Sequence, residues 1–256
     1  MTAAHASIEA FIDGTDAAEA TLLVLNRTEP APLLDLLSRA FERQPVHVVE
    51  HEVPGPIEDE VLLLDESGLA ARSPLDAVAR SFLLINADRF RTGANDLQEG
   101  AVPAVLRELT DIEFDLQGYP ASAKEKLLLV VMSRYIEAAA LRADGGELHV
   151  GFGRLSRLED EYGTRQVYEL LGDSGVETHV YGVASGETQY PDGLVVHEGE
   201  SEEYRRSWIL AFEPPMDEEA AVALVAWETG HNVWRGTWTF DAARAHEVAD
   251  YVRAAF

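Results

Sequence analysis

The sequence predicts an α/β fold in which a mixed β-sheet is flanked by helices. In the first half, short apolar runs alternate with amphipathic segments, which is the βα pattern of α/β proteins, and the second half is richer in strand-like segments. A hydrophobic content of 46% in 256 residues is enough for a sizeable core. We expect a βα-alternating N-terminal region, residues 1–120, and a strand-rich C-terminal region, residues 121–256, as parts of one unit.

The N-terminal region opens with an apolar run over residues 21–26, TLLVLN, which is typical of a buried strand. The elements predicted after it are a helix over 32–43, strands over 46–49 and 61–64, a helix over 74–80, and a strand over 82–86. This last run, FLLIN, resembles the first strand, but the two do not repeat at a fixed period. The segment 54–60 is rich in Pro, Gly and Glu and predicts a loop.

A long central helix is predicted next. Ser122 and Glu125 have the S-x-x-E spacing of a capping box, in which the two side chains satisfy free amides at a helix start. The helix continues to Leu141, and apolar residues on nearly every face predict that it is buried. The Asp-Gly-Gly sequence at 144–146 ends it.

The C-terminal region is predicted to contain several antiparallel strands. The expected elements are strands over 147–152 and 176–181, a helix over 164–171 closed by Gly172, and strands over 208–212, 221–228 and 234–240. Period-two alternation places Trp234, Trp238 and Phe240 on one side of the last strand. Asp241 can cap a final helix running to about residue 253. Residues 185–203 are expected to form a loop.

The acidic composition predicts a soluble, cytoplasmic protein adapted to concentrated salt. The chain has 46 Asp and Glu against 20 Lys and Arg, a net charge of -26. Residues 1–120 carry 22 acidic and 8 basic residues and residues 121–256 carry 24 and 12, so the charge is spread evenly. A surface this anionic argues against direct nucleic-acid binding. No signal peptide or run of 18 apolar residues is present, so no membrane association is expected.

Recognisable catalytic and metal-binding motifs are absent. There is no cysteine, no phosphate-binding loop with a lysine after glycine, and no G-x-S-x-G sequence. His-Glu pairs begin at His51, His197 and His246, but none has the second histidine four residues on that a zincin motif needs. The sequence therefore predicts a protein that is not an enzyme, without a metal site, and it identifies no cofactor.

Two histidines have alternative interpretations. His179, on a predicted strand, is either a hydrogen-bonded structural residue or a pH-sensing group, because its ordinary pKa lies near neutrality. His246, which precedes Glu247 on the last predicted helix, is either part of a solvated face or a phosphoacceptor.

Basic residues gather in one part of the chain. From residue 124 to residue 165 there are seven basic and seven acidic residues, so this segment is neutral. Arg154, Arg157 and Arg165 lie in it, and they serve either internal ion pairs or an anionic ligand or acidic partner. A second group, residues 204–208, combines Arg206 with Trp208 and could stack on a planar ligand or pack internally.

From residue 124 onward the chain resembles the DICT domain, a sensory module found with diguanylate cyclases and two-component systems. Four segments carry the resemblance: SRYIE at 133–137, GTRQVYELLGDSGVETHVYG at 163–182, EYRRSWILAF at 203–212, and residues 223–241 with LVAWE and GTWTFD. It implies a domain that senses a ligand or partner without known catalysis. No cyclase, kinase or receiver domain accompanies it.

Three hypotheses follow, with the sensory one leading. The chain is a sensory module for a small ligand or for a signalling protein such as a histidine kinase or a transcription regulator. Alternatively it is an interaction adaptor whose aromatic face forms a homodimer or docks a partner, or an enzyme with unrecognised carboxylate or arginine chemistry. The expected ligand-binding residues are Arg154, Arg157, Arg165, Tyr168, Arg206, Trp208 and Trp238.

Overall fold

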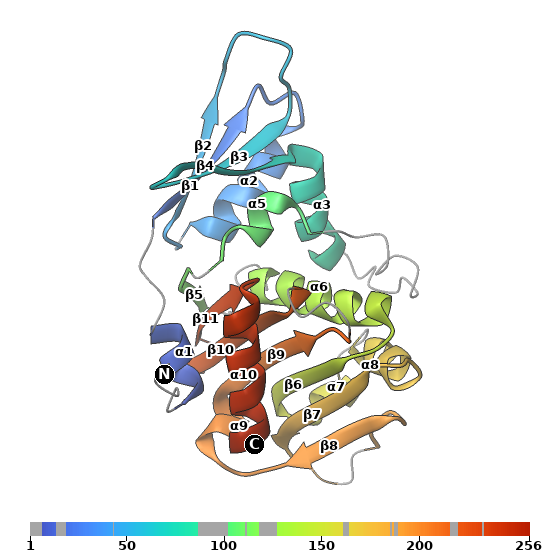
Figure 1. Ribbon diagram of the computed structural model, residues 1–256. Coiled ribbons are helices and arrows are strands. Elements are labelled where there is room, and N and C mark those ends of the chain that lie inside the picture. Colours follow the sequence, from blue (N-terminus) through green and yellow to red (C-terminus); the bar gives the residue numbers. More distant parts are fainter. Residues whose placement is uncertain are drawn as a thin grey trace.

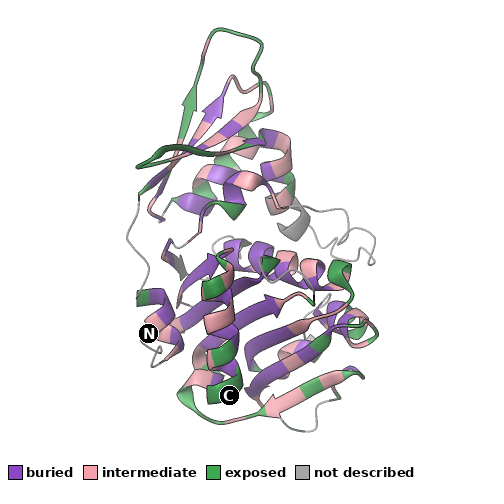
Figure 2. Cartoon of the chain, in the orientation of Figure 1, coloured by how far each residue is buried: buried purple, intermediate pink, exposed green. Residues whose placement is uncertain are grey.

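The computed structural model of the chain contains two mixed β-sheets with helices on their faces, which confirms the predicted α/β class (Figure 1). It describes residues 7–13, 19–42, 44–86, 102–110, 112–117, 127–160, 164–184, 186, 189–215, 220–231 and 233–256. Buried residues concentrate in the strands of the larger sheet and in the helices that lie between the two sheets (Figure 2). Within the described ranges, no helix is long and apolar enough to cross a membrane.

The smaller sheet has four strands in the order β2-β1-β3-β4. They are β1 (Ala20–Leu25), β2 (Val46–His51), β3 (Glu60–Asp65) and β4 (Gly68–Pro74). The helix α2 (Ala31–Phe41) connects the parallel strands β1 and β2, and β3 and β4 are antiparallel additions. The predicted strands over 21–26, 46–49 and 61–64 and the helix over 32–43 are confirmed. The strand β4 was not predicted, because its mostly exposed residues show no apolar alternation.

The prediction of a strand over residues 82–86 is wrong. These residues form the end of helix α3 (Leu75–Asn86), which also contains most of the helix predicted over 74–80. Leu75, Val78 and Ala79 are buried at helical spacing, so the apolar run continues an amphipathic helix. A run of four apolar residues fits a helix turn as well as a buried strand, and periodicity alone does not separate the two.

The larger sheet has seven strands in the order β5-β11-β10-β9-β6-β7-β8. They are β5 (Phe114–Gln117), β6 (Glu147–Arg154), β7 (Glu177–Val183), β8 (Leu194–Glu198), β9 (Ser207–Glu213), β10 (Val222–Gly230) and β11 (Val233–Thr239). Strands β6, β7 and β8 are parallel, and the others are antiparallel to their neighbours. This confirms the five strands predicted in the second half and their largely antiparallel pairing.

Helices cover both faces of the larger sheet. One face packs with α6 (Leu127–Ala143) and α8 (Thr164–Gly172), and the other with α1 (Ile8–Asp13) and α10 (Ala242–Ala255). The alternation along β9 shows the division, since Leu210 belongs to the first core and Ile209 to the second. Trp234 and Trp238 lie together in the first core, as the period-two pattern predicted.

The core that contains α6 extends into the smaller sheet. It includes buried residues of β1, β3 and α3 and of α5 (Ala104–Arg107), and α3 packs against α6 (Figure 1). Two elements before residue 120 are associated with the larger sheet: β5 is its edge strand, and α1 packs on one of its faces. The two sheets thus share one continuous hydrophobic core.

The ends of α6 can be compared with the capping signals. The capping box at Ser122 and Glu125 lies outside the described residues. At the other end Asp144 has a φ of 48° and Gly146 a φ of 86°, and a Cβ on Gly146 would lie 2.2 Å from the carbonyl oxygen of Glu213. The glycine is therefore required where α6 turns into β6. Asp241 caps α10 as predicted, accepting a 2.9 Å hydrogen bond from the amide of Arg244.

The loop predicted over residues 185–203 is partly wrong. It contains the edge strand β8 and the first residues of the short helix α9 (Glu202–Arg206). The strand β8 is only half-buried, so its residues lack the apolar alternation that identifies a strand. The short helix α7 (Arg157–Asp160) was also not predicted. The loop predicted over 54–60 is confirmed up to Asp59, since β3 begins at Glu60.

Candidate functional site

Two of the seven predicted ligand-binding residues, Arg157 and Trp208, contact each other on the face of the larger sheet that α6 covers. The guanidinium carbon of Arg157 lies 5.9 Å from the ring centroid of Trp208 and 6.0 Å from that of Trp234. The two indoles are edge-to-face, with centroids 5.9 Å apart. These distances are those of cation–π contacts, which stabilise the packing of Arg157 against both rings.

Trp238 and Trp208 both have a buried indole nitrogen. Trp238 is 1% exposed and stacks on Phe114 with ring centroids 4.4 Å apart. Neither Nε1 atom has a hydrogen-bond partner among the described residues. The rings nevertheless pack in the hydrophobic core. Packing in the core therefore accounts for the aromatic pattern of β11.

Tyr168 lies in a buried polar network. It is fully buried, and its hydroxyl donates a 2.9 Å hydrogen bond to Glu137, which is 2% exposed. Arg134 pairs with the same carboxylate at 2.6 Å and donates a 3.0 Å hydrogen bond to Thr164. Burial, followed by the charge of Glu137, holds the pKa of Tyr168 well above its usual value. Part of the neutral segment 124–165 is therefore an internal ion pair.

The remaining predicted arginines are dispersed. Arg154 is exposed at the end of β6, and Arg165 pairs with Glu169 one turn along α8 at 2.8 Å. Arg206 donates a hydrogen bond to the carbonyl of Glu228 and lies 4.8 Å from the ring centroid of Trp227, which packs on the opposite face of the sheet from Trp208. The structure thus places the seven residues in several separate surroundings.

Arg165 borders a cavity of about 520 Å³ beside α8. Its other lining residues are Glu169, Asp173, Gln189, Tyr190, Pro191 and Asp192. Three of them are acidic, and Arg165 is already paired with one of the three. An anionic ligand at Arg165 would meet this negative charge, so the cavity does not suit the anion that the arginine pattern suggested.

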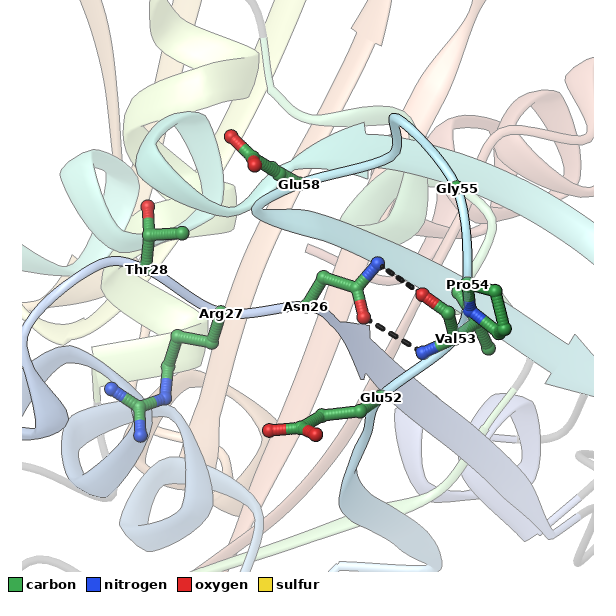
Figure 3. A pocket seen from close by; sticks show the side chains of 8 residues that line it. All are labelled: Asn26, Arg27, Thr28, Glu52, Val53, Pro54, Gly55 and Glu58. Atoms are coloured by element: carbon green, nitrogen blue, oxygen red, sulfur yellow. Dashed lines mark hydrogen bonds between the residues drawn. The ribbon is translucent and has the colours of Figure 1, made fainter.

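A second cavity lies where β1 and β2 end, at the carboxyl edge of the smaller sheet (Figure 3). It has a volume of about 540 Å³ and is lined by two segments, residues 26–28 after β1 and residues 52–58 after β2. Ligands of open α/β sheets bind outside the carboxyl ends of parallel strands. The sequence signal for this site is weak, because only the Asn at the end of the first strand and the Pro-Gly loop mark it.

Asn26 joins the two walls of the cavity. Its amide nitrogen donates to the carbonyls of Val53 and Ile57, at 2.9 and 2.6 Å, and its amide oxygen accepts from the amide of Val53 at 2.7 Å. Figure 3 shows the two hydrogen bonds with Val53. The backbone of Asn26 has a φ of 44°, a left-handed conformation that asparagine adopts more readily than most residues. The side chain therefore fixes the loop after β2 to the turn after β1.

Asp59 fastens the same turn from the other side. It accepts hydrogen bonds from the amides of Thr28 and Glu29, at 2.6 and 3.0 Å, and from the Thr28 hydroxyl. Burial raises its pKa, but these hydrogen bonds outweigh burial and hold the pKa of Asp59 below its usual value. The carboxylate thus stays ionised and keeps the rim of the cavity in place.

The charged side chains of this cavity give it a negative balance. Arg27 is already engaged, because its Nε lies 2.9 Å from Glu50 and its Nη1 donates to the carbonyl of Glu29. Glu52 and Glu58 are exposed, and neither has an ion-pair partner among the described residues. The arrangement favours a polar ligand with a positively charged group.

Three histidines form a row across β6, β7 and β8. His149 is fully buried and its ring stacks on that of His179 at 5.1 Å, which in turn stacks on that of His197 at 5.2 Å. His179 Nδ1 lies 2.9 Å from His197 Nε2, and His149 Nδ1 lies 3.0 Å from the Tyr181 hydroxyl. His179 is thus a hydrogen-bonded strand histidine. The sequence did not indicate His149, because single histidines on separate strands form no motif.

The comparisons with known proteins leave the family open. No family model matches the chain, and no curated protein matches it. A crystal structure of polyphosphate kinase from Porphyromonas gingivalis aligns with 96% of this chain and 47% of its own, with 13% identity and a TM-score of 0.35. The chain spans about half the length of that protein. Similarity at this level carries no argument about fold or function.

Proposed function

We propose that the protein is a ligand-sensing domain without catalysis of its own, in which a small polar molecule binds in the cavity at the carboxyl ends of β1 and β2. The observation that carries the proposal is this cavity of about 540 Å³, whose walls are hydrogen-bonded to each other through Asn26. Its volume suits a small organic ligand. The resemblance to the DICT family, which begins at residue 124, supports a sensory role. The cavity lies outside that segment, in the N-terminal region.

The ligand that fits best carries an amine or another cationic group. The carboxylates of Glu52 and Glu58 are the unpaired charges among the residues that line the cavity, because Arg27 is paired with Glu50. An anionic ligand would have to overcome both acidic side chains. The main-chain groups of Pro54 and Gly55, which Asn26 does not bond, can supply hydrogen bonds to the polar remainder of the ligand.

Binding there has a physical route to the rest of the molecule. The cavity follows β1, and β1 packs through the shared core with α3, which packs against α6 of the larger sheet. A ligand that changes the spacing of the two loops would therefore act on elements that contact the larger sheet. In this proposal the protein works in a salt-rich cytoplasm, alone or as a homodimer, and passes the change to a separate signalling protein such as a histidine kinase or a transcription regulator.

A thermal-shift screen tests the proposal with defined compounds. Aliphatic diamines, basic amino acids and quaternary ammonium compounds are added at millimolar concentration, at the lowest salt concentration that keeps the chain folded. A ligand that binds only the folded chain raises the melting temperature. The shift should disappear in Glu52→Gln/Glu58→Gln and persist in Glu66→Gln/Glu200→Gln, which removes the same charge from exposed acids elsewhere. If both double variants lost the melting-temperature shift equally, the shift would come from general charge attraction. That result would overturn the assignment of the cavity.

A further inference from the structure

A second cluster of charged residues lies on the larger sheet, beneath α10. Glu147 and His149 are two residues apart on β6 and so face the same side, and Glu213 of β9 is directly opposite Glu147 in the antiparallel register. One ligand-type atom from each of the three residues lies within 4.8 Å of the others. The sheet register alone therefore brings two carboxylates and an imidazole together.

The imidazole of His149 is held in place at one nitrogen, and its other nitrogen has no hydrogen-bond partner within the described part of the chain. Its Nδ1 lies 3.0 Å from the Tyr181 hydroxyl. Its Nε2 is buried and lies 3.0 Å from Glu147 Oε1, but no hydrogen bond joins this nitrogen to a described residue. A fully buried nitrogen left in this state costs free energy unless something else binds it.

The cation that now pairs with both carboxylates comes from α10. Arg253 Nη2 lies 2.8 Å from Glu147 Oε2 and also contacts Glu213 Oε2, while its Nη1 pairs with Asp250 at 2.9 Å. His246, two turns earlier on the same face of α10, contacts the other oxygen of Glu213. The guanidinium therefore lies between the two carboxylates, where a divalent ion would balance their charge. None of these Arg253 contacts involves His149 Nε2.

We propose that Glu147, His149 and Glu213 form a binding site for a divalent transition metal of the zinc class, which takes the place of the Arg253 guanidinium. One imidazole nitrogen and two carboxylate oxygens suit Zn²⁺ and related ions better than Mg²⁺ or Ca²⁺, which prefer oxygen ligands alone. Ligand atoms around tetrahedral zinc lie about 3.4 Å apart, so the three atoms need to move inward by roughly 1 Å or less. Two carboxylates neutralise the charge of the ion.

The surroundings of His149 support this role. With a metal at Nε2, the Nδ1 proton of His149 would be donated to the Tyr181 oxygen, the type of outer hydrogen bond that orients metal-binding histidines. The other titratable groups that face the cluster are His179, whose Nε2 lies 3.4 Å from Glu147, and His246 on α10.

Metal binding would change the attachment of α10. The guanidinium of Arg253 ties the last turns of this helix to β6 and β9 through Glu147 and Glu213. Once the metal holds both carboxylates, Arg253 keeps only its partner Asp250, which lies on the same helix. The site would thus couple metal binding to the position of the C-terminal helix. This inference does not depend on the cavity at β1 and β2.

Equilibrium dialysis with Zn²⁺, followed by elemental analysis, tests the site on the full chain. The wild type should bind one Zn²⁺ per chain. In a parallel dialysis with Mg²⁺ alone, it should bind no Mg²⁺. Glu213→Gln should weaken Zn²⁺ binding at least tenfold, and Glu147→Gln provides a second test if the first variant fails to fold. His51→Gln, which removes an exposed histidine on β2, should leave binding unchanged.

The sharpest variant is Arg253→Gln, because it removes the competing cation and leaves all three ligands in place. We expect Zn²⁺ to bind about tenfold more tightly, which corresponds to about 1.4 kcal/mol. Asp250→Asn is the matched control, since it alters a partner of Arg253 outside the ligand set, and it should not weaken binding. Equal Zn²⁺ affinity in the wild type and Glu213→Gln, or no gain in Arg253→Gln, would overturn the proposal.

Discussion

The Tyr168 hydroxyl donates a 2.9 Å hydrogen bond to the carboxylate of Glu137, deep inside the molecule. The same carboxylate pairs with Arg134, so one buried acid connects α6 and α8. Removing one member of a buried ion pair leaves an uncompensated charge, which is far more costly than losing an exposed pair. Glu137, predicted to lie in a helix, and Tyr168, predicted to bind a ligand, thus hold α6 and α8 together.

Glu137→Ala should lower the free energy of unfolding by about 3–5 kcal/mol, because Arg134 and Tyr168 both lose this buried carboxylate. Arg165→Gln breaks the exposed Arg165–Glu169 pair and should cost less than about 1 kcal/mol. Urea denaturation followed by circular dichroism measures both changes. A cost below 1 kcal/mol for Glu137→Ala would show that the buried network does not stabilise the fold.

Arg157→Gln should destabilise the protein by about 1 kcal/mol, because it removes the cation–π contacts with Trp208 and Trp234. Arg154→Gln is the matched control, since Arg154 is exposed at the end of β6 and should contribute almost nothing. Tryptophan fluorescence during urea unfolding reports on both variants. If the two variants had the same unfolding midpoint, the contacts of Arg157 would not contribute to stability.

The stability of the protein should fall between pH 7 and pH 5. Burial lowers the pKa of His149 to about 4, so the unfolded chain binds a proton at this residue before the folded chain does. The contribution is complete above the unfolded pKa of about 6.5 and decreases as the pH falls toward 4, with about 2 kcal/mol lost by pH 5. The lowered pKa of Glu147 adds a loss of the same sign at lower pH.

The control for this pH dependence is a pair of single variants. His149→Gln should flatten the slope of the unfolding free energy between pH 7 and 5, whatever its effect at pH 7. His51→Gln removes an exposed histidine and should keep the slope. An unchanged slope in His149→Gln would assign the pH dependence to other groups.

Low salt should destabilise the chain as a whole. At a net charge of -26 the acidic side chains repel one another, and the Debye length grows from about 3 Å at 1 M salt to about 10 Å at 0.1 M. We expect the melting temperature to fall by about 5–10 °C between 2 M and 0.1 M KCl, a loss of a few kcal/mol. Differential scanning calorimetry at several KCl concentrations measures it, and a melting temperature independent of salt would contradict adaptation to concentrated salt.

Much of the fold could be predicted because the core strands are strongly patterned. The run TLLVLN and the alternation of Trp234 and Trp238 both gave correct strands, since burial on one or both faces leaves a clear signal. The edge strands β4 and β8 were missed because their residues are largely exposed. The run FLLIN was assigned to the wrong class, because a short apolar segment fits either a strand or a buried helix turn.

The candidate sites depend on contacts that no local pattern contains. Asn26 and Val53 are joined across a loop, and Glu147 meets Glu213 only through the register of β6 with β9. Arginine and tryptophan residues close together in an acidic sequence suggested a ligand site, but Arg157 packs on Trp208, which itself contacts the core. Residue types alone do not reveal whether such a group faces a ligand or the interior.

Native mass spectrometry of the protein purified from its own cells tests the sensing proposal most directly. We expect one small organic molecule per chain, absent from Glu52→Gln/Glu58→Gln and retained in the control variant Glu66→Gln/Glu200→Gln. A stable complex with another protein and no small molecule in any form of the chain would contradict ligand sensing and favour an interaction adaptor.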